Sequence, residues 1–89
     1  MARKEVVLIT GANGEVGHGL IEHLGKRGDV NIVALDVHPL AKELRRYCQE
    51  VIIGDVLDSM MLGRLVFEYE IRTIYHLASI LSTKAEFIP

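Results

Sequence analysis

Cysteine is almost missing from this chain of 89 residues, in which Cys48 is the single example. One cysteine excludes an intrachain disulfide and any zinc site built from cysteine clusters. It fits a reducing compartment, so we expect a cytoplasmic protein. Cys48 itself is interpreted as a small core residue, because nothing in its sequence surroundings indicates a reactive thiolate.

The chain also lacks a strong excess of positive or negative charge, and it has no long apolar run. Ten basic residues stand against twelve acidic ones, for a net charge of −2, and they form no basic stripe. Nucleic acid and an anionic membrane are therefore poor candidates for a partner. No apolar run suits a transmembrane span or a signal peptide, and we expect neither. The 49% of hydrophobic residues is enough for the core of one small domain.

Apolar runs alternate along the chain with amphipathic segments. The runs predict strands at residues 6–9, 30–35, 51–53 and 72–77. Helices are predicted over residues 15–27, over a short stretch that opens at His38 and Pro39, and over 59–70. The order β-α-β-α-β-α-β predicts the α/β class, with a doubly wound parallel sheet of strand order 3-2-1-4.

Signals in the sequence also define the two longer helices. Gly28 is predicted to end the first helix and Asp58 to cap the start of the last one. The first helix should bury Val16, Leu20, Ile21 and Leu24, and the last one Met61, Leu62, Leu65, Val66 and Tyr69. Both helices should therefore pack on the sheet.

Polar residues stand at the ends of all four predicted strands. They are Thr10, Asp36, Asp55 and Ser79. The carboxyl edge of an open α/β sheet is where ligands bind, so the four positions together predict a binding site at that edge.

Three glycines, Gly11, Gly14 and Gly17, follow the first strand in the pattern G-x-x-G-x-x-G. Asn13, inside the same loop, is assigned with them to the cofactor-binding site. Gly11 would allow the sharp turn, Gly14 would let a pyrophosphate approach, and Gly17 would let the helix pack closely. The backbone N–H groups of Glu15 and Val16 would bind the phosphate at the helix start. A Walker A loop is excluded because no Lys-Ser/Thr follows. The alternative is a purely structural turn.

The remaining strand ends suit other parts of a dinucleotide. Asp36 can accept hydrogen bonds from the adenosine ribose hydroxyls and would repel a 2′-phosphate, which favours NAD over NADP. The alternative is that Asp36 is a solvated aspartate in a turn. Asp55 and Val56 could contact adenine, or Asp55 could form an Asx turn. Leu77, Ala78 and Ser79 end the fourth strand, where small residues would let the backbone approach the nicotinamide side of the cofactor. Ser79 is otherwise an exposed loop hydroxyl.

The histidines do not indicate a metal site. His18 and His23 are five residues apart and diverge on a helix, and no carboxylate–histidine spacing suits a metal. His76 lies in a predicted strand, where a buried, hydrogen-bonded histidine is the expected role.

Residues 10–17, Asp36, Gly54-Asp55 and residues 76–79 together resemble the extended short-chain dehydrogenase/reductase family, which includes NAD-dependent epimerases and dehydratases. The resemblance implies a Rossmann-type NAD-binding domain, in which the glycine loop takes the pyrophosphate. It also implies hydride transfer at a hydroxyl-bearing carbon of a small-molecule substrate, in a parent that is a homodimer. The tail is most similar to the epimerase-like L-threonine dehydrogenases, which implies that Ser82 lies near the substrate.

The family's catalytic Tyr-x-x-x-Lys pair does not occur in these residues. Four positions after Tyr47, Tyr69 and Tyr75 stand Val51, Thr73 and Ser79. No catalytic residue is therefore assigned, and we expect residues 1–89 to be the N-terminal part of the NAD-binding domain. A non-catalytic dinucleotide sensor and a free-standing nucleotide-binding module are the alternatives. The second would leave the fourth strand as an exposed edge.

Overall fold

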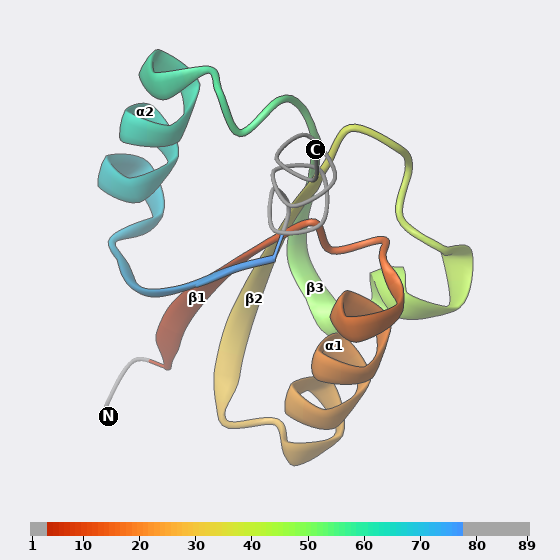
Figure 1. Cartoon of the computed structure of the whole chain (residues 1–89). Coiled ribbons are helices and arrows are strands. Elements are labelled where there is room, and N and C mark those ends of the chain that lie inside the picture. Colours follow the sequence, from red (N-terminus) through yellow and green to blue (C-terminus); the bar gives the residue numbers. More distant parts are fainter. Residues whose placement is uncertain (1–3, 78–89) are drawn as a thin grey trace, which may run out of the picture.

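The computed structural model describes residues 4–77, which form a four-stranded parallel sheet in the order β3-β2-β1-β4 (Figure 1). The strands are β1 (Glu5–Thr10), β2 (Val30–Asp36), β3 (Cys48–Ile53) and β4 (Ile71–His76). Between them lie α1 (Glu15–Arg27), the 3₁₀-helix η1 (Lys42–Tyr47) and α2 (Ser59–Tyr69). The predicted fold class and strand order are confirmed.

β1 is the centre of the sheet and the best-buried element. It pairs with β2 on one side and β4 on the other, and Leu8 and Ile9 are completely buried. A continuous apolar run of this kind suits a parallel strand covered on both faces. In the register of the sheet, Thr10 lies opposite Leu35 of β2 and His76 of β4. The ends of these three strands therefore meet at one edge.

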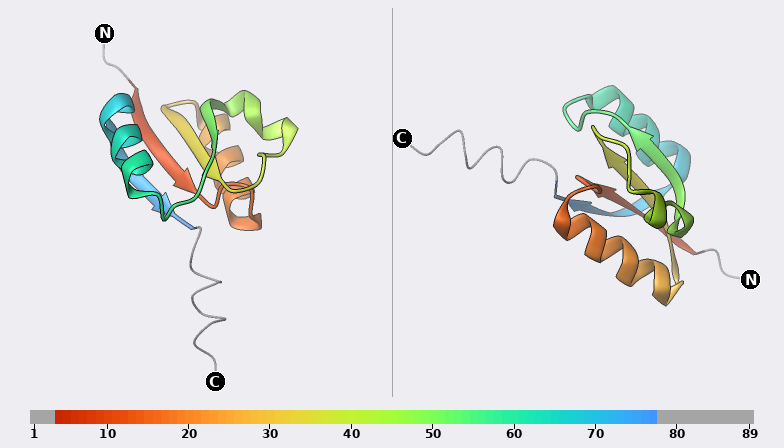
Figure 2. Two further views of the ribbon diagram at one scale, coloured as in Figure 1. Left: turned by 90° about the horizontal axis from the view of Figure 1, so that it is seen from above. Right: turned by 90° about the vertical axis from the view of Figure 1, so that its right-hand side faces the viewer.

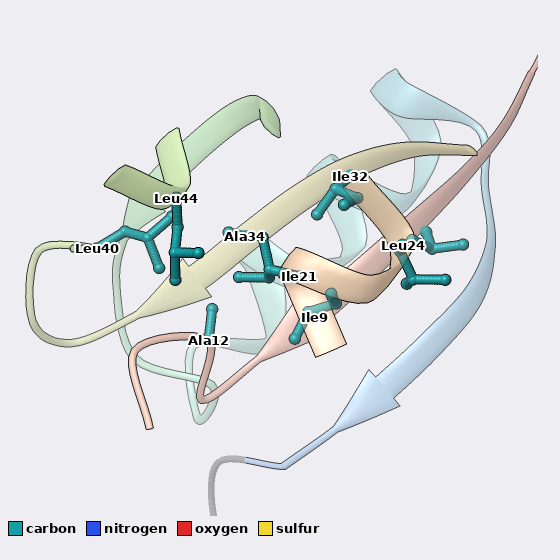
Figure 3. Packing of buried hydrophobic residues seen from close by; sticks show 9 residues of the cluster. Ile9, Ala12, Ile21, Leu24, Ile32, Ala34, Leu40 and Leu44 are labelled. Atoms are coloured by element: carbon teal, nitrogen blue, oxygen red, sulfur yellow. The ribbon is translucent and has the colours of Figure 1, made fainter. Parts of the chain in front are cut away.

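The two faces of the sheet carry separate apolar clusters. Figure 2 shows α1 on one face and α2 on the other. Successive residues of β1 alternate between the faces, as the pleat requires. Val7 and Ile9 join the cluster under α1 and η1, much of which is drawn in Figure 3, whereas Val6 and Leu8 join the cluster under α2.

The bounds of the two main helices match the prediction, except that α2 ends at Tyr69, one residue early. α1 spans Glu15–Arg27, and Gly28 follows it in the left-handed conformation with φ 76°. The side chain of Asp58 caps α2 by accepting from the N–H of Met61. The prediction of a buried Val16 is wrong, because its side chain is 69% exposed. Val16 lies in the first turn, off the face of Gly17, Ile21 and Leu24 that contacts the sheet.

Two other boundaries differ from the prediction by more than one residue. The helical stretch expected from His38 is an extended loop followed by a 3₁₀-helix that begins only at Lys42. β3 begins at Cys48, three residues before the apolar run, because its backbone pairs with β2 from Ile32 onward. An edge strand needs no apolar side chains to form such a ladder, and Gln49 and Glu50 are exposed.

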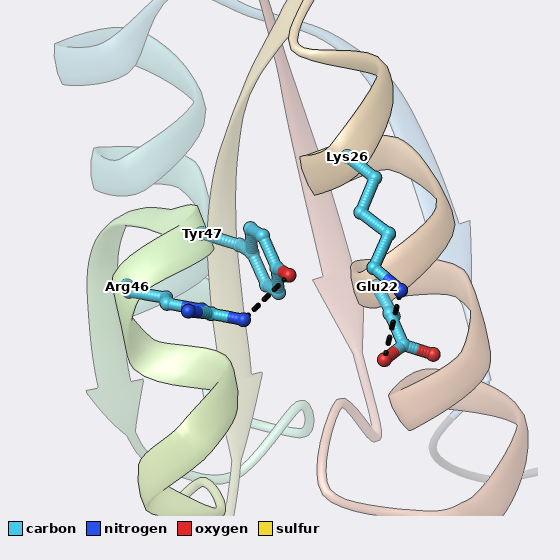
Figure 4. Close-up of polar contacts among 4 residues, drawn as sticks. All are labelled: Glu22, Lys26, Arg46 and Tyr47. Atoms are coloured by element: carbon cyan, nitrogen blue, oxygen red, sulfur yellow. Dashed lines mark hydrogen bonds and ion pairs between the residues drawn. The ribbon is translucent and has the colours of Figure 1, made fainter.

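The ring of Tyr47, the last residue of η1, packs against α1. A Cβ atom added to Gly25 of α1 would lie 2.3 Å from the Cγ atom of the Tyr47 ring, so the close contact requires glycine there. The Arg46 guanidinium lies 4.8 Å from the centre of this ring and also donates to the Tyr47 hydroxyl at 2.9 Å (Figure 4). On the outer face of α1, Lys26 and Glu22 form an ion pair at 3.5 Å. η1 is thus fixed against α1, at the far end of the loop that follows β2.

Within residues 4–77, no helix has both the length and the apolar character that a membrane crossing needs.

Candidate nucleotide site at the carboxyl edge of the sheet

The loop between β1 and α1 lies at the carboxyl edge of the sheet. Gly11 has φ 68°, a conformation that favours glycine, and its carbonyl accepts from the N–H of Gly14 at 3.1 Å. The N–H of Ala12 donates to the Leu35 carbonyl of β2 at 3.2 Å. The glycine loop is therefore a tight turn held against the neighbouring strand.

The start of α1 is open. Gly14 is its N-cap, and no side chain caps it. Among residues 4–77, the N–H groups of Glu15, Val16 and Gly17 have no hydrogen-bond acceptor. Unpaired N–H groups and the positive end of the helix dipole together make a site for an anion.

Gly14 and Gly17 differ in whether the surrounding atoms leave room for a side chain. A Cβ atom on Gly17 would lie 2.4 Å from the Ala12 carbonyl oxygen, so the packing of helix against loop requires glycine. A Cβ atom on Gly14 would meet only the Gly11 carbonyl oxygen, at an ordinary 3.4 Å. The backbone of Gly14, with φ −79° and ψ 174°, is also open to any residue. Neither packing nor conformation within the described chain requires glycine at this position.

The Asp36 carboxylate lies next to the glycine loop. Its Oδ2 atom accepts from the N–H of Asn13 at 2.9 Å, and its Oδ1 atom accepts from the N–H of His38 at 2.9 Å. The second bond is the turn interaction that was the alternative interpretation. Each carboxylate oxygen has two lone pairs, so each keeps one for a further donor.

The side chain of Asn13 makes contacts that the sequence did not reveal. Its Oδ1 atom accepts from the N–H of Ala41 at 3.0 Å and lies 3.2 Å from the Nε2 atom of His18. The glycine loop, α1 and the loop of residues 37–41 therefore meet at one amide group. The one available signal was a polar residue inside a glycine loop, and it does not identify partners 5 and 28 residues away.

Asp55 forms the predicted alternative, an Asx turn. Its Oδ1 atom accepts from the N–H of Leu57 at 2.9 Å, and its carbonyl accepts from the N–H of Asp58 at 3.0 Å. Val56 is half-buried and packs against the apolar cluster under α2. These residues lead from the end of β3 into α2.

Thr10 connects the ends of β1 and β4. Its buried hydroxyl oxygen lies 2.8 Å from the Nδ1 atom of His76 and accepts from the N–H of Leu77 at 3.1 Å. His76 is hydrogen-bonded as expected, but the prediction that it is buried is wrong, because it stands on the exposed edge strand. Ala78, Ser79 and Ser82 lie outside the described residues.

Cys48 is partly buried against the cluster under α1. Burial raises the pKa of its thiol to about 11, so the thiol is protonated at neutral pH. Its S–H group donates to the Leu44 carbonyl at 3.7 Å. Within residues 4–77, no three His, Cys, Asp or Glu side chains are grouped so that they could hold a metal ion.

A family model described as the NAD dependent epimerase/dehydratase family matches residues 7–88. The chain belongs to this family. A search of curated proteins finds no match.

Several solved structures of enzymes share the fold. The Bordetella bronchiseptica enzyme WbmG, in complex with NAD, is 29% identical, with a TM-score of 0.71 over 86% of this chain. L-threonine dehydrogenase from Clostridium difficile is 31% identical, with a TM-score of 0.71 over 96%. UDP-glucose 4-epimerase from Brucella ovis, in complex with NAD, is 21% identical and shows the fold alone, with a TM-score of 0.72 over 93%. The chain spans only 26% of the WbmG structure and 27% of each of the other two.

Proposed function

We propose that this chain binds NAD and is the N-terminal part of the cofactor-binding domain of an NAD-dependent epimerase, dehydratase or dehydrogenase. One observation carries the proposal above all: α1 begins with uncapped N–H groups beside a carboxylate at the end of the next strand. A dinucleotide presents a pyrophosphate next to a ribose diol, which needs N–H donors beside a carboxylate acceptor.

The pyrophosphate would lie against the start of α1. The N–H groups of Glu15, Val16 and Gly17 are available to its oxygens, and the helix dipole favours its charge. Gly14 leaves the helix start uncovered, although the packing around it would tolerate a Cβ atom. We therefore attribute the glycine at position 14 to the space that the pyrophosphate needs.

The adenosine ribose would lie against Asp36. Two lone pairs of the carboxylate already accept backbone N–H groups, and the other two can accept one hydroxyl each. A 2′-phosphate in the same place would bring like charges together, so Asp36 favours NAD over NADP.

The other contacts complete an extended site. We assign Asp55 and Val56 to the adenine, with the free Oδ2 atom of Asp55 facing the ring amino group. Residues 77–79 are assigned to the nicotinamide ribose side, and Ser82 to the neighbourhood of the substrate. The link from Thr10 to Leu77 supports this placement, because it holds the end of β4 beside the glycine loop.

When bound, NAD supplies hydride transfer at a hydroxyl-bearing carbon. The residues of this chain bind and orient the two nucleotides, while proton transfer depends on residues outside it. The single cysteine supports a cytoplasmic setting, and the family resemblance supports a homodimer. A non-catalytic NAD sensor is the alternative, and a Tyr-x-x-x-Lys pair in a longer form of the protein would favour the enzyme.

The test is calorimetric titration of NAD and NADP into the full chain and into Asp36→Arg. We expect the wild type to prefer NAD and the variant to shift toward NADP by about tenfold or more, because one like-charge contact becomes an ion pair. Asp36→Asn is the control, since it keeps the size and one acceptor but removes the charge. A wild type that binds neither dinucleotide would contradict the proposal, and an unchanged preference in Asp36→Arg would remove Asp36 from the ribose site.

A further inference from the structure

Asn13 holds the loop of residues 37–41 at both of its ends. Its backbone N–H donates to Asp36, whose other oxygen accepts from His38 at the start of the loop. Its side-chain Oδ1 atom accepts from the N–H of Ala41 at the end of the loop. Between these ends Leu40 is 2% exposed and packs in the cluster under α1. The loop is thereby closed against the glycine loop.

The chemistry of these contacts determines how Asn13 is oriented. The N–H of Ala41 is only a donor, so it must face the oxygen of the Asn13 amide and not its NH₂ group. The Nε2 atom of His18 lies 3.2 Å from that same oxygen and must therefore carry a proton.

We propose that Asn13 is a positioning residue, which orders the loop of residues 37–41 beside the adenosine ribose. This inference rests on the proposed NAD site. The oxygen of the Asn13 side chain is already shared by two protein donors, so it has no remaining lone pair for a ribose hydroxyl. Asn13 therefore acts through Asp36 and Ala41, and the fit of the adenosine half depends on it.

The experiment compares two variants that break the same hydrogen bond from opposite sides. Asn13→Ala removes the acceptor. Ala41→Pro removes the donor and suits the backbone of Ala41, whose φ is −53°. His18→Ala is the matched control, because it removes the other donor and keeps the bond to Ala41. Each variant is titrated with NAD and, separately, with inorganic pyrophosphate, which reports on the start of α1 alone.

We expect Asn13→Ala and Ala41→Pro to weaken NAD binding by about tenfold, since an ordered loop and a buried hydrogen bond are lost. Pyrophosphate binding should change by less than about twofold, because the helix start is unaltered. Exchange of the Ala41 amide proton should accelerate in Asn13→Ala and remain slow in Asn13→Asp, which keeps the acceptor. His18→Ala should have the smaller effect on NAD.

The outcomes separate this inference from the proposed function. A wild type that does not bind NAD would contradict the function. A wild type that binds NAD, with unchanged affinity in both Asn13→Ala and Ala41→Pro, would contradict the role of Asn13 alone. Equal losses for NAD and pyrophosphate, together with a lower melting temperature, would show that Asn13 only stabilises the fold.

Discussion

The two main helices both begin at the carboxyl edge of the sheet, yet they begin differently. α1 starts at Gly14 without a side-chain cap, whereas α2 starts at Asp58, whose carboxylate accepts from the N–H of Met61. A cap of this kind typically stabilises a protein by about 1 kcal/mol. α1 forgoes that stabilisation, and its first N–H groups remain available to an anion.

The two helix starts differ in whether the protein supplies a capping carboxylate. At α2 the protein itself supplies the negative group, so a phosphate would meet a like charge. At α1 the Asp36 carboxylate, which is on the next strand, accepts from the loop N–H of Asn13 and does not cap the helix. The carboxylate of Asp36 therefore leaves the first N–H groups of α1 uncapped.

The largest effect is expected for Gly14→Asp, which gives α1 an aspartate cap like that of α2. We expect NAD binding to weaken by about 100-fold, because a fixed carboxylate would occupy the N–H groups and repel the pyrophosphate. Stability should rise by a few tenths of a kcal/mol, since an aspartate caps better than glycine. Calorimetry and thermal melts measure the two effects. Retained NAD affinity would show that the pyrophosphate binds elsewhere.

Gly17→Ala tests whether the glycine loop depends on close packing. The added Cβ would lie 2.4 Å from the Ala12 carbonyl oxygen, which belongs to the backbone and cannot rotate away. We expect a loss of about 2 kcal/mol in the free energy of unfolding. Gly19→Ala is the matched control, because nothing lies within 4 Å of its Cβ position. It should gain about 0.5–1 kcal/mol. Equal effects in urea unfolding would refute the packing role.

Asp58→Ala removes the cap of α2. The free energy of unfolding should fall by about 1 kcal/mol, while NAD affinity should stay within about twofold of the wild type. Asp58→Asn, which keeps a capping oxygen, should restore most of the stability. A large loss of NAD affinity in a folded Asp58→Ala protein would mean that the start of α2 also serves the ligand.

The smallest effect is expected at the other ends of the helices. Both end in a left-handed residue, Gly28 after α1 and Glu70 after α2, with φ 76° and 54°. Glu70→Gly should raise the stability by about 0.5 kcal/mol, because glycine adopts this conformation without steric cost. Glu70→Ala keeps that cost and loses the side chain, so it should be the less stable variant in the same unfolding experiment. The reverse order would contradict the argument.

Local signals explain why so much of the fold was predictable. α1 lies between Gly14 and Gly28 in an amphipathic segment, and each feature can be read without knowing the partner elements. β3 was predicted too short, because the pairing of Cys48 with Ile32 is a backbone interaction that leaves no apolar pattern. His76 was expected to be buried because it lies inside a predicted strand, but β4 is the edge of the described sheet.

The candidate site also has features that the sequence shows and features that only the structure shows. The glycine spacing and the aspartate after the second strand were visible in the sequence, because the chain order of such folds places them at one edge. The amide of Asn13 and the N–H of Ala41 are 28 residues apart, and their contact depends on how two loops converge. No sequence periodicity indicates a contact between two loops of this kind. Sequence spacing identified the groups that we propose for the ligand, but not the groups that hold them in place.

The sequence by itself determined the α/β class, the strand order and the glycine loop, because hydrophobic periodicity and residues that suit turns act over short distances. Only the tertiary structure decided which lone pairs of Asp36 are already used, which donors Asn13 holds, and that the start of α1 is open while that of α2 is closed. Those facts depend on atoms from distant segments meeting at hydrogen-bond distance, and that is a property of the folded chain alone.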